Sequence, residues 1–238
     1  MYRTLNPELI VATLDKLRAR IVARFPTAGL AKVCGELCDI ARRSHMRTLA
    51  IERPAYGLRA FILLMIGAGL AALGYVALLL LTRQKVSDDL FGTIQAVDAT
   101  FNIFVLTGAS IFFLLTLEER VKRTRALAAL NELRSIVHVI DMHQLTKDPM
   151  TLDGPRTPAS PARTMTPFEL TRYLDYCSEM LSLTAKIAAM YAQSSSDAVV
   201  IDAVSDLTTL TTNLSSKIWQ KITLVHAYES KNPARAAS

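Results

Sequence analysis

Two stretches of the chain contain no charged residue, and both are long enough to cross a lipid bilayer as a helix. They cover residues 60–81 and residues 99–117. At 1.5 Å per residue the first stretch spans about 33 Å as a helix, which matches a hydrocarbon core of roughly 30 Å. The second stretch is shorter and more polar, and it meets the lower part of the usual range. The pattern predicts two transmembrane helices joined by a short external loop.

Outside these stretches, apolar residues recur every three or four positions, which is the spacing of one helix face. No segment alternates apolar and polar residues over the length of a strand, so we expect no β structure. The sequence therefore predicts an all-α integral membrane protein, in which two transmembrane helices form a hairpin and the remaining helices form a cytoplasmic bundle.

Several predicted helices carry recognisable end signals. Residues 6–8 read Asn-Pro-Glu, a helix start with a cap, a proline and an acid in the first turn. Residues 166–169 read Thr-Pro-Phe-Glu, a capping box. Residues 118–147 contain neither Gly nor Pro. We therefore expect the second transmembrane helix to continue into the bundle as one rod over residues 99–147, about 73 Å long.

These patterns divide the chain into eight segments. They are N-terminal cytoplasmic helices (1–58), a first transmembrane helix (60–81), a loop (82–98), a second transmembrane helix (99–117), a cytoplasmic rod (118–147), a Pro-rich linker (148–165), an αα-hairpin (166–229) and a tail (230–238).

Basic residues next to the apolar stretches predict the orientation. Five arginines precede the first stretch within residues 39–59, and five basic residues follow the second within residues 118–137. The loop between them holds only Arg83 and Lys85 against three aspartates. The positive-inside rule then places both termini in the cytoplasm. The first stretch begins too far along the chain for a cleavable secretory signal, and we expect a bacterial inner (plasma) membrane.

The chain has 238 residues, a net charge of +6 and a mean hydropathy of +0.27. Most of the positive charge lies before the first apolar stretch or directly after the second. Basic residues in such positions set topology and attract anionic lipid, so we do not expect nucleic-acid binding. The residues predicted to contact anionic lipid are Arg120, Lys122, Arg123 and Arg125.

The most pointed polar cluster outside the membrane lies near the end of the rod. His138 and Asp141 are three residues apart and share a helix face, which suits a pH-sensitive pair, whereas His143 lies on another face. The alternative is an ordinary polar helix end, where His and Lys are favoured by the helix dipole.

Neither the cysteines nor the short motifs predict an enzyme. Cys34 and Cys38 are one helical turn apart, but no His or Cys lies at zinc-finger spacing from them, so we interpret them and Cys177 as free, mostly buried thiols. No Gly-rich phosphate loop or nucleophile elbow is present. We expect no catalytic activity, no cofactor and no bound metal.

Within the apolar stretches, two sets of residues bear on function. Gly67, Ala71 and Gly74 form a small-residue stripe that permits close helix–helix packing and favours a homo-oligomer. The second set is a loosely defined polar face in the second helix, made by Asn102, Thr107 and Ser110.

Two hypotheses follow. One is a non-catalytic membrane anchor or scaffold whose bundle binds a cytoplasmic protein partner. The alternative is an oligomeric two-helix pore or ion channel gated by the bundle, and this alternative requires the polar face to line a path.

Overall fold

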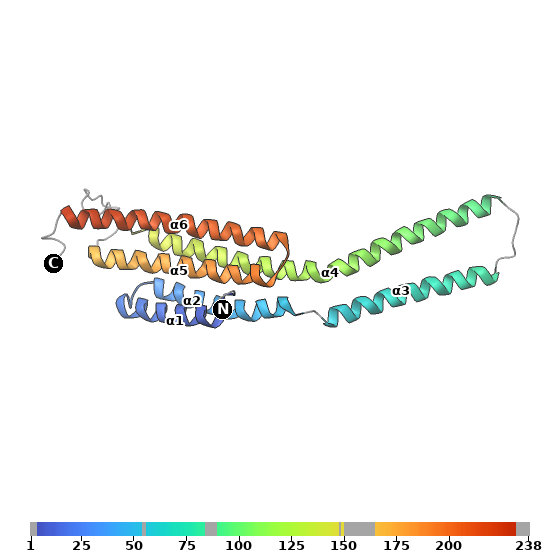
Figure 1. The fold of residues 1–238 in the computed structure, drawn as a ribbon, viewed down its shortest axis with the longest axis horizontal. Coiled ribbons are helices and arrows are strands. Elements are labelled where there is room, and N and C mark those ends of the chain that lie inside the picture. The colour runs from blue at the N-terminus through green and yellow to red at the C-terminus, as the bar shows by residue number, and fades with distance from the viewer. Residues whose placement is uncertain (1–3, 54–55, 84–89, 148, 150–164, 232–238) are drawn as a thin grey trace. The chain divides into compact units, whose positions relative to one another are not determined.

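A computed structural model describes residues 4–53, 56–83, 90–147, 149 and 165–231. The described residues form helices and contain no β-strand, as the sequence predicts. In chain order the helices are α1 (Pro7–Arg24), α2 (Leu30–Glu52), α3 (Tyr56–Arg83), α4 (Leu90–Leu145), α5 (Pro167–Ser194) and α6 (Ala198–Lys231) (Figure 1).

Two helix starts have the predicted caps. Asn6 Oδ1 accepts hydrogen bonds from the backbone N–H groups of Glu8 and Leu9, at 2.9 and 3.3 Å. At α5 the Thr166 hydroxyl accepts from Glu169 N at 3.2 Å, and the Glu169 carboxylate accepts from Thr166 N at 2.8 Å. These bonds satisfy backbone donors that have no partner inside the helix, and they fix where α1 and α5 begin.

The long helix begins earlier than the sequence pattern suggested. Residues 90–98, which we assigned to the loop, are the first turns of α4. In the sequence, Leu90, Ile94 and Val97 recur at helical spacing, so the helical pattern extends toward the N-terminus from the second apolar stretch. At its other end α4 stops at Leu145, and the helix is about 84 Å long at 1.5 Å per residue. Apart from Pro149 and Met165, the Pro-rich linker lies outside the described residues, as does the tail beyond Lys231.

The chain divides into two compact units, which we describe separately. One unit contains residues 53–124, and the other contains residues 1–52 together with residues 125–238. The larger unit is a helical bundle of α1, α2, the last part of α4, α5 and α6. Within it α5 and α6 form the αα-hairpin that the sequence predicts, and they lie side by side (Figure 1).

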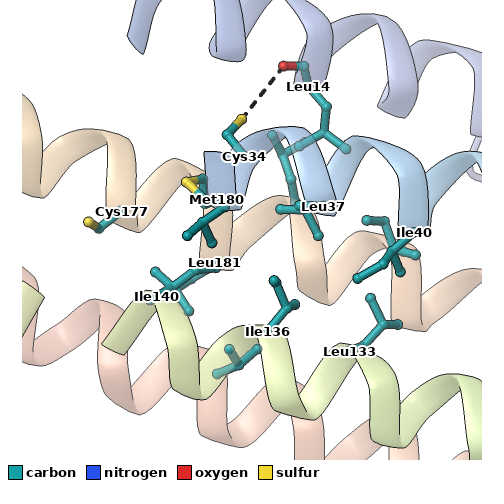
Figure 2. Close-up of a cluster of buried hydrophobic side chains, with 14 of the residues drawn as sticks. Leu14, Cys34, Leu37, Ile40, Leu133, Ile136, Ile140, Cys177, Met180 and Leu181 are labelled. Carbon is teal, nitrogen blue, oxygen red and sulfur yellow. Dashed lines mark hydrogen bonds between the residues drawn. The ribbon is translucent and has the colours of Figure 1, made fainter. Parts of the chain in front are cut away.

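The apolar faces of the bundle meet in one core. Leu14 of α1, Leu37 of α2, Leu133 of α4 and Leu181 of α5 are all fully buried. Figure 2 shows this cluster, with side chains from the four helices pointing toward one another. Replacing one such leucine with alanine typically costs about 2–5 kcal/mol, so each of these four helices contributes to the stability of the bundle.

The smaller unit consists of α3 and the first part of α4. In the described part of the chain, α4 is the one helix that is long and apolar enough to span a membrane. The apolar segment described in α3, Arg59–Ala72, is too short to meet the same criterion. The second membrane span therefore stays a prediction. No residue in the most apolar part of α4 is buried.

Candidate functional site

The apolar side chains of α4 in the smaller unit are exposed. Phe104 has 77% of its surface exposed, Leu106 has 67% and Phe112 has 68%. On α3 the side chains of Leu63 and Leu64 are exposed to a similar degree. In the described part of this unit Ile62 and Glu118 alone are buried. A large contiguous apolar surface of this kind is the mark of a surface that meets lipid or another protein.

The small-residue stripe of α3 is open. Gly67, Ala71 and Gly74 are exposed, and a Cβ added to Gly67 or Gly74 would meet no atom within 4 Å. The described residues of this chain therefore do not use the stripe for packing.

The predicted polar face of α4 makes its hydrogen bonds within its own helix. The Ser110 hydroxyl donates to Leu106 O at 2.8 Å, and Asn102 Nδ2 donates to Asp98 O at 3.1 Å. Asn102 and Ser110 are exposed, whereas Thr107 is half-buried. The three side chains thus differ in exposure, and two of them are already hydrogen-bonded without a ligand or water path.

An ion-pair cluster that we did not predict joins α3 to α4. Arg59 Nε donates to Glu118 Oε2 at 2.6 Å, and Lys122 Nζ lies 3.0 Å from Glu118 Oε1. The Glu118 side chain is 11% exposed. The sequence did hold a signal for this pair. Arg59 directly precedes the first apolar stretch and Glu118 directly follows the second. If the two stretches form an antiparallel hairpin, these two residues lie next to each other at its end.

The four basic residues predicted to contact lipid have different surroundings. Lys122 is paired with Glu118, and the Arg120 guanidinium lies over the Phe113 ring, 5.4 Å from its centroid. Arg123 is half-buried, and Arg125 is exposed. The positive charge of Lys122 is therefore partly neutralised, whereas Arg125 is exposed.

The His138–Asp141 pair is not formed. His138 is exposed, and no hydrogen bond or ion pair in the described residues connects it to Asp141. Asp141 Oδ1 instead accepts a hydrogen bond from Gln144 Nε2 at 2.6 Å. His143, which lies on another face, contacts α5 through its Nδ1, 3.3 Å from the Tyr173 hydroxyl.

Gln144 connects this helix end to α6. Lys221 Nζ donates to Gln144 Oε1 at 2.7 Å and to the backbone carbonyl of Gln144 at 3.0 Å. That carbonyl is one of the last in α4, and it also accepts a hydrogen bond from the backbone N–H of Lys147 at 3.1 Å. The ammonium of Lys221 therefore satisfies the helix end and lies where the helix dipole favours positive charge. Sequence spacing gave no sign of this contact, because the two residues are far apart in the chain.

A second polar cluster lies between α2 and α4. Glu132 accepts hydrogen bonds from Arg43 Nη2 at 2.8 Å and from Arg47 Nη1 at 2.7 Å. The hydrogen bond from Arg47 is the main cause that holds the pKa of Glu132 below its usual value. These bonds attach α4 to α2 at the edge of the core.

The three cysteines are free and buried, as predicted. Burial raises the pKa of the Cys177 thiol to about 12. The Cys34 thiol lies 4.0 Å from Leu14 O (Figure 2), and its neighbour Cys38 together with burial raises its pKa. The hydrogen bond with Cys34 lowers the pKa of Cys38. Buried thiols such as Cys34 and Cys177, whose pKa is raised, act as small apolar core residues. The described residues contain no group of three or more His, Cys, Asp or Glu side chains that could hold a metal ion.

Comparisons of the chain with known protein families, with curated proteins and with solved structures find no match. Function is therefore inferred from the residues and their contacts.

Proposed function

We propose that this chain is a non-catalytic membrane scaffold, in which α3 and the first part of α4 anchor a helical bundle that binds protein. The observation that carries the proposal is the exposure of the apolar surface of α4, exemplified by Phe104 and Phe112. Each Å² of apolar surface left in water costs roughly 25 cal/mol. The neighbouring bundle buries its own apolar residues efficiently, so the exposed surface of α4 fits a lipid environment.

We further propose that the anchor is a two-span hairpin with both termini in the cytoplasm. The Arg59–Glu118 contact supports this arrangement, because it pairs the residue before the first apolar stretch with the residue after the second. The excess of basic residues on both of these flanks supports the cytoplasmic side for the bundle. A bacterial inner (plasma) membrane is the proposed location.

The contacts in the bundle favour a scaffold over an enzyme. The polar side chains near the end of α4 hold helices together: Gln144 binds Lys221, and His143 contacts Tyr173. In the membrane part, the open positions at Gly67 and Gly74 leave room for a helix from another copy, and this supports self-assembly.

Reconstitution separates the scaffold from a pore. The purified full-length protein is expected to stay in the membrane after alkaline extraction and to leave planar bilayers silent. A protein that is released by alkaline extraction would contradict the membrane anchor. Reproducible unitary currents that change in the Asn102→Leu variant would contradict the scaffold and support the pore. The matched control for conductance is Ile103→Leu, an apolar exchange on the adjacent position of α4.

A further inference from the structure

A hollow of about 420 Å³ lies between α3 and α4 inside the smaller unit. This volume falls within the roughly 300–1,000 Å³ of pockets that hold a small ligand. Four of its lining residues are charged, namely Arg59, Glu118, Glu119 and Lys122, and the other three are apolar. The hollow therefore offers both kinds of surface that an amphipathic ligand needs.

The charged and the apolar lining residues are one helical turn apart on both helices. On α3, Ile62 and Leu63 follow Arg59 by three and four residues. On α4, Leu115 precedes Glu118 by three residues. The apolar lining residues thus lie within the two apolar stretches, and the charged ones lie just outside them. A phospholipid has the same order, with a charged headgroup at the bilayer surface and acyl chains in the hydrocarbon core.

The apolar end of the hollow is open to its surroundings. Leu63 has 69% of its surface exposed and Leu115 has 61%, whereas Ile62 is buried. An acyl chain can therefore enter the hollow from the side, along these two leucines. A water-soluble ligand would leave the same leucines in water, at a cost of roughly 25 cal/mol for each Å² of apolar surface. The open apolar end thus favours a lipid over a soluble ligand.

The two cations of the hollow have N–H groups to offer a phosphate. Glu118 accepts from Arg59 Nε at 2.6 Å and from Arg59 Nη2 at 3.4 Å, and Lys122 Nζ lies 3.0 Å from its Oε1. A guanidinium has five N–H donors and an ammonium has three, so both cations keep donors that these bonds do not use. Because two cations share one carboxylate, the cluster of Arg59, Glu118 and Lys122 has a net positive charge, which the phosphate diester of a phospholipid would neutralise.

Glu119 adds a negative charge at the exposed rim of the same hollow. With Glu119, the lining contains two acidic and two basic side chains and is neutral overall. Basic pockets between membrane helices bind strongly anionic headgroups, but the Glu119 carboxylate would repel such a headgroup. A headgroup with an ammonium beside its phosphate matches this lining. A primary ammonium also donates N–H groups to the carboxylate, which the trimethylammonium of choline cannot do.

We infer that this hollow binds a phospholipid with a zwitterionic, primary-amine headgroup, the chemistry of phosphatidylethanolamine. Its phosphate lies against Arg59 and Lys122, and its ammonium lies against Glu119. An acyl chain covers Leu63 and Leu115. The inference rests on the proposed membrane anchor, and it adds the class of lipid that the anchor selects.

Native mass spectrometry of the full-length protein, purified in detergent and freed of lipid, measures this binding. The probes are phosphatidylethanolamine, phosphatidylcholine and phosphatidylglycerol with identical acyl chains. We expect phosphatidylethanolamine to bind at a severalfold lower concentration than the other two lipids. In Leu63→Trp the larger side chain occupies the apolar end of the hollow, so binding should weaken severalfold. Leu64→Trp, at a similarly exposed position that does not line the hollow, is the matched control and should bind as the wild type.

Glu119→Gln tests the headgroup separately from the acyl chain. This exchange removes the carboxylate and keeps the size of the side chain, so the preference for phosphatidylethanolamine over phosphatidylcholine should be lost. Asp202→Asn removes an exposed acidic side chain of α6 and should leave the preference unchanged. Leu63 and Glu119 are exposed, so folding should be retained in both variants, and circular dichroism verifies that the helices are intact.

The results that would overturn the inference differ in what else they affect. Equal affinity for the three lipids, or a preference for phosphatidylglycerol, contradicts the proposed headgroup and leaves the membrane anchor standing. Unchanged lipid binding in Leu63→Trp, or an unchanged preference in Glu119→Gln, shows that the lipid binds elsewhere, and the anchor again stands. Release of the protein by alkaline extraction contradicts both the anchor and the lipid site.

Discussion

Arg59 and Glu118 form an ion pair between two helices whose charged ends border the two apolar stretches of the chain. Glu118 also accepts from Lys122 on the next turn of α4. A carboxylate that is largely covered and has two cationic partners keeps the start of α3 close to α4. The contact gives the proposed membrane hairpin a fixed point at the end that leads into the bundle.

Removing either partner of this pair should weaken the hairpin. In a double-mutant cycle of Arg59→Gln and Glu118→Gln, we expect a small favourable coupling between the two positions, because Arg59 is exposed and solvent screens the pair. The coupling should shrink at high salt. The measurement is denaturation of the protein in mixed micelles, and Glu119→Gln, an exposed neighbour, is the control with an expected effect within about 0.5 kcal/mol. Additive single effects would show that the pair does not stabilise the fold.

Leucine at the open glycine positions of α3 should weaken assembly. Gly67→Leu and Gly74→Leu place bulk where the described chain has no neighbouring atom, so the monomer should fold normally. Close approach of a second copy along this stripe should be blocked. Cross-linking in detergent measures the dimer fraction, and Ala68→Leu, on a different part of the helix circumference, is the matched control. An unchanged dimer fraction in both glycine variants would exclude the stripe from the interface.

Loss of the Lys221 ammonium should destabilise the bundle. Lys221→Met leaves the side-chain oxygen of buried Gln144 without this donor, and a buried unsatisfied group costs about 1–3 kcal/mol, whereas the Gln144 carbonyl keeps its hydrogen bond from Lys147 N. Lys217→Met, one turn earlier and exposed, should change the free energy of unfolding by less than about 0.5 kcal/mol. Thermal unfolding followed by circular dichroism compares the two. Equal effects would mean that the bond to Gln144 contributes nothing specific.

The helices and the starts of α1 and α5 could be predicted from the sequence, whereas most contacts between helices could not. The caps at Asn6 and Thr166 are local sequence signals for helix starts. The regular apolar spacing after residue 117 is likewise a local signal, and it predicts that α4 continues beyond the apolar stretch. From spacing alone we predicted that Asp141 pairs with His138. Instead Gln144, which is also three residues from Asp141, donates a hydrogen bond to its carboxylate. Gln144 is itself held by Lys221 from α6, and the packing of distant helices decides such choices.

The start of α4 was misplaced for a related reason. We ended the loop at residue 98 because Asp98 is charged, but α4 begins at Leu90 and includes Asp98, so the charged residue does not stop the helix. Hydropathy locates a membrane segment, and helix ends are determined by capping and by backbone hydrogen bonds.

Cys177 should make the stability of the bundle depend on pH in the alkaline range. Its pKa rises to about 12 in the folded protein from a usual value near 9.0. Below about pH 9 the thiol is protonated in both states and has no effect. Between about 9 and 12 the unfolded chain loses the proton that the folded chain keeps, so the free energy of unfolding falls as pH rises, with a slope of at most about 1.4 kcal/mol per pH unit.

Denaturant unfolding at several pH values compares the wild type with Cys177→Ala to isolate this contribution. The difference in slope between the two proteins should appear only above about pH 9. Parallel curves up to pH 11 would show that the folded protein does not hold the proton on this thiol.

The most direct test of the membrane hairpin is the sidedness of labelling by a membrane-impermeant maleimide. The native cysteines are buried and should give little background in the folded protein. Ser87→Cys introduces a thiol in the sequence between α3 and α4, and Asn213→Cys introduces one on the exposed surface of α6. In sealed vesicles of known orientation, the account predicts that Ser87→Cys is labelled from the external side and Asn213→Cys from the cytoplasmic side. Labelling of both variants from the same side would contradict the two-span membrane anchor.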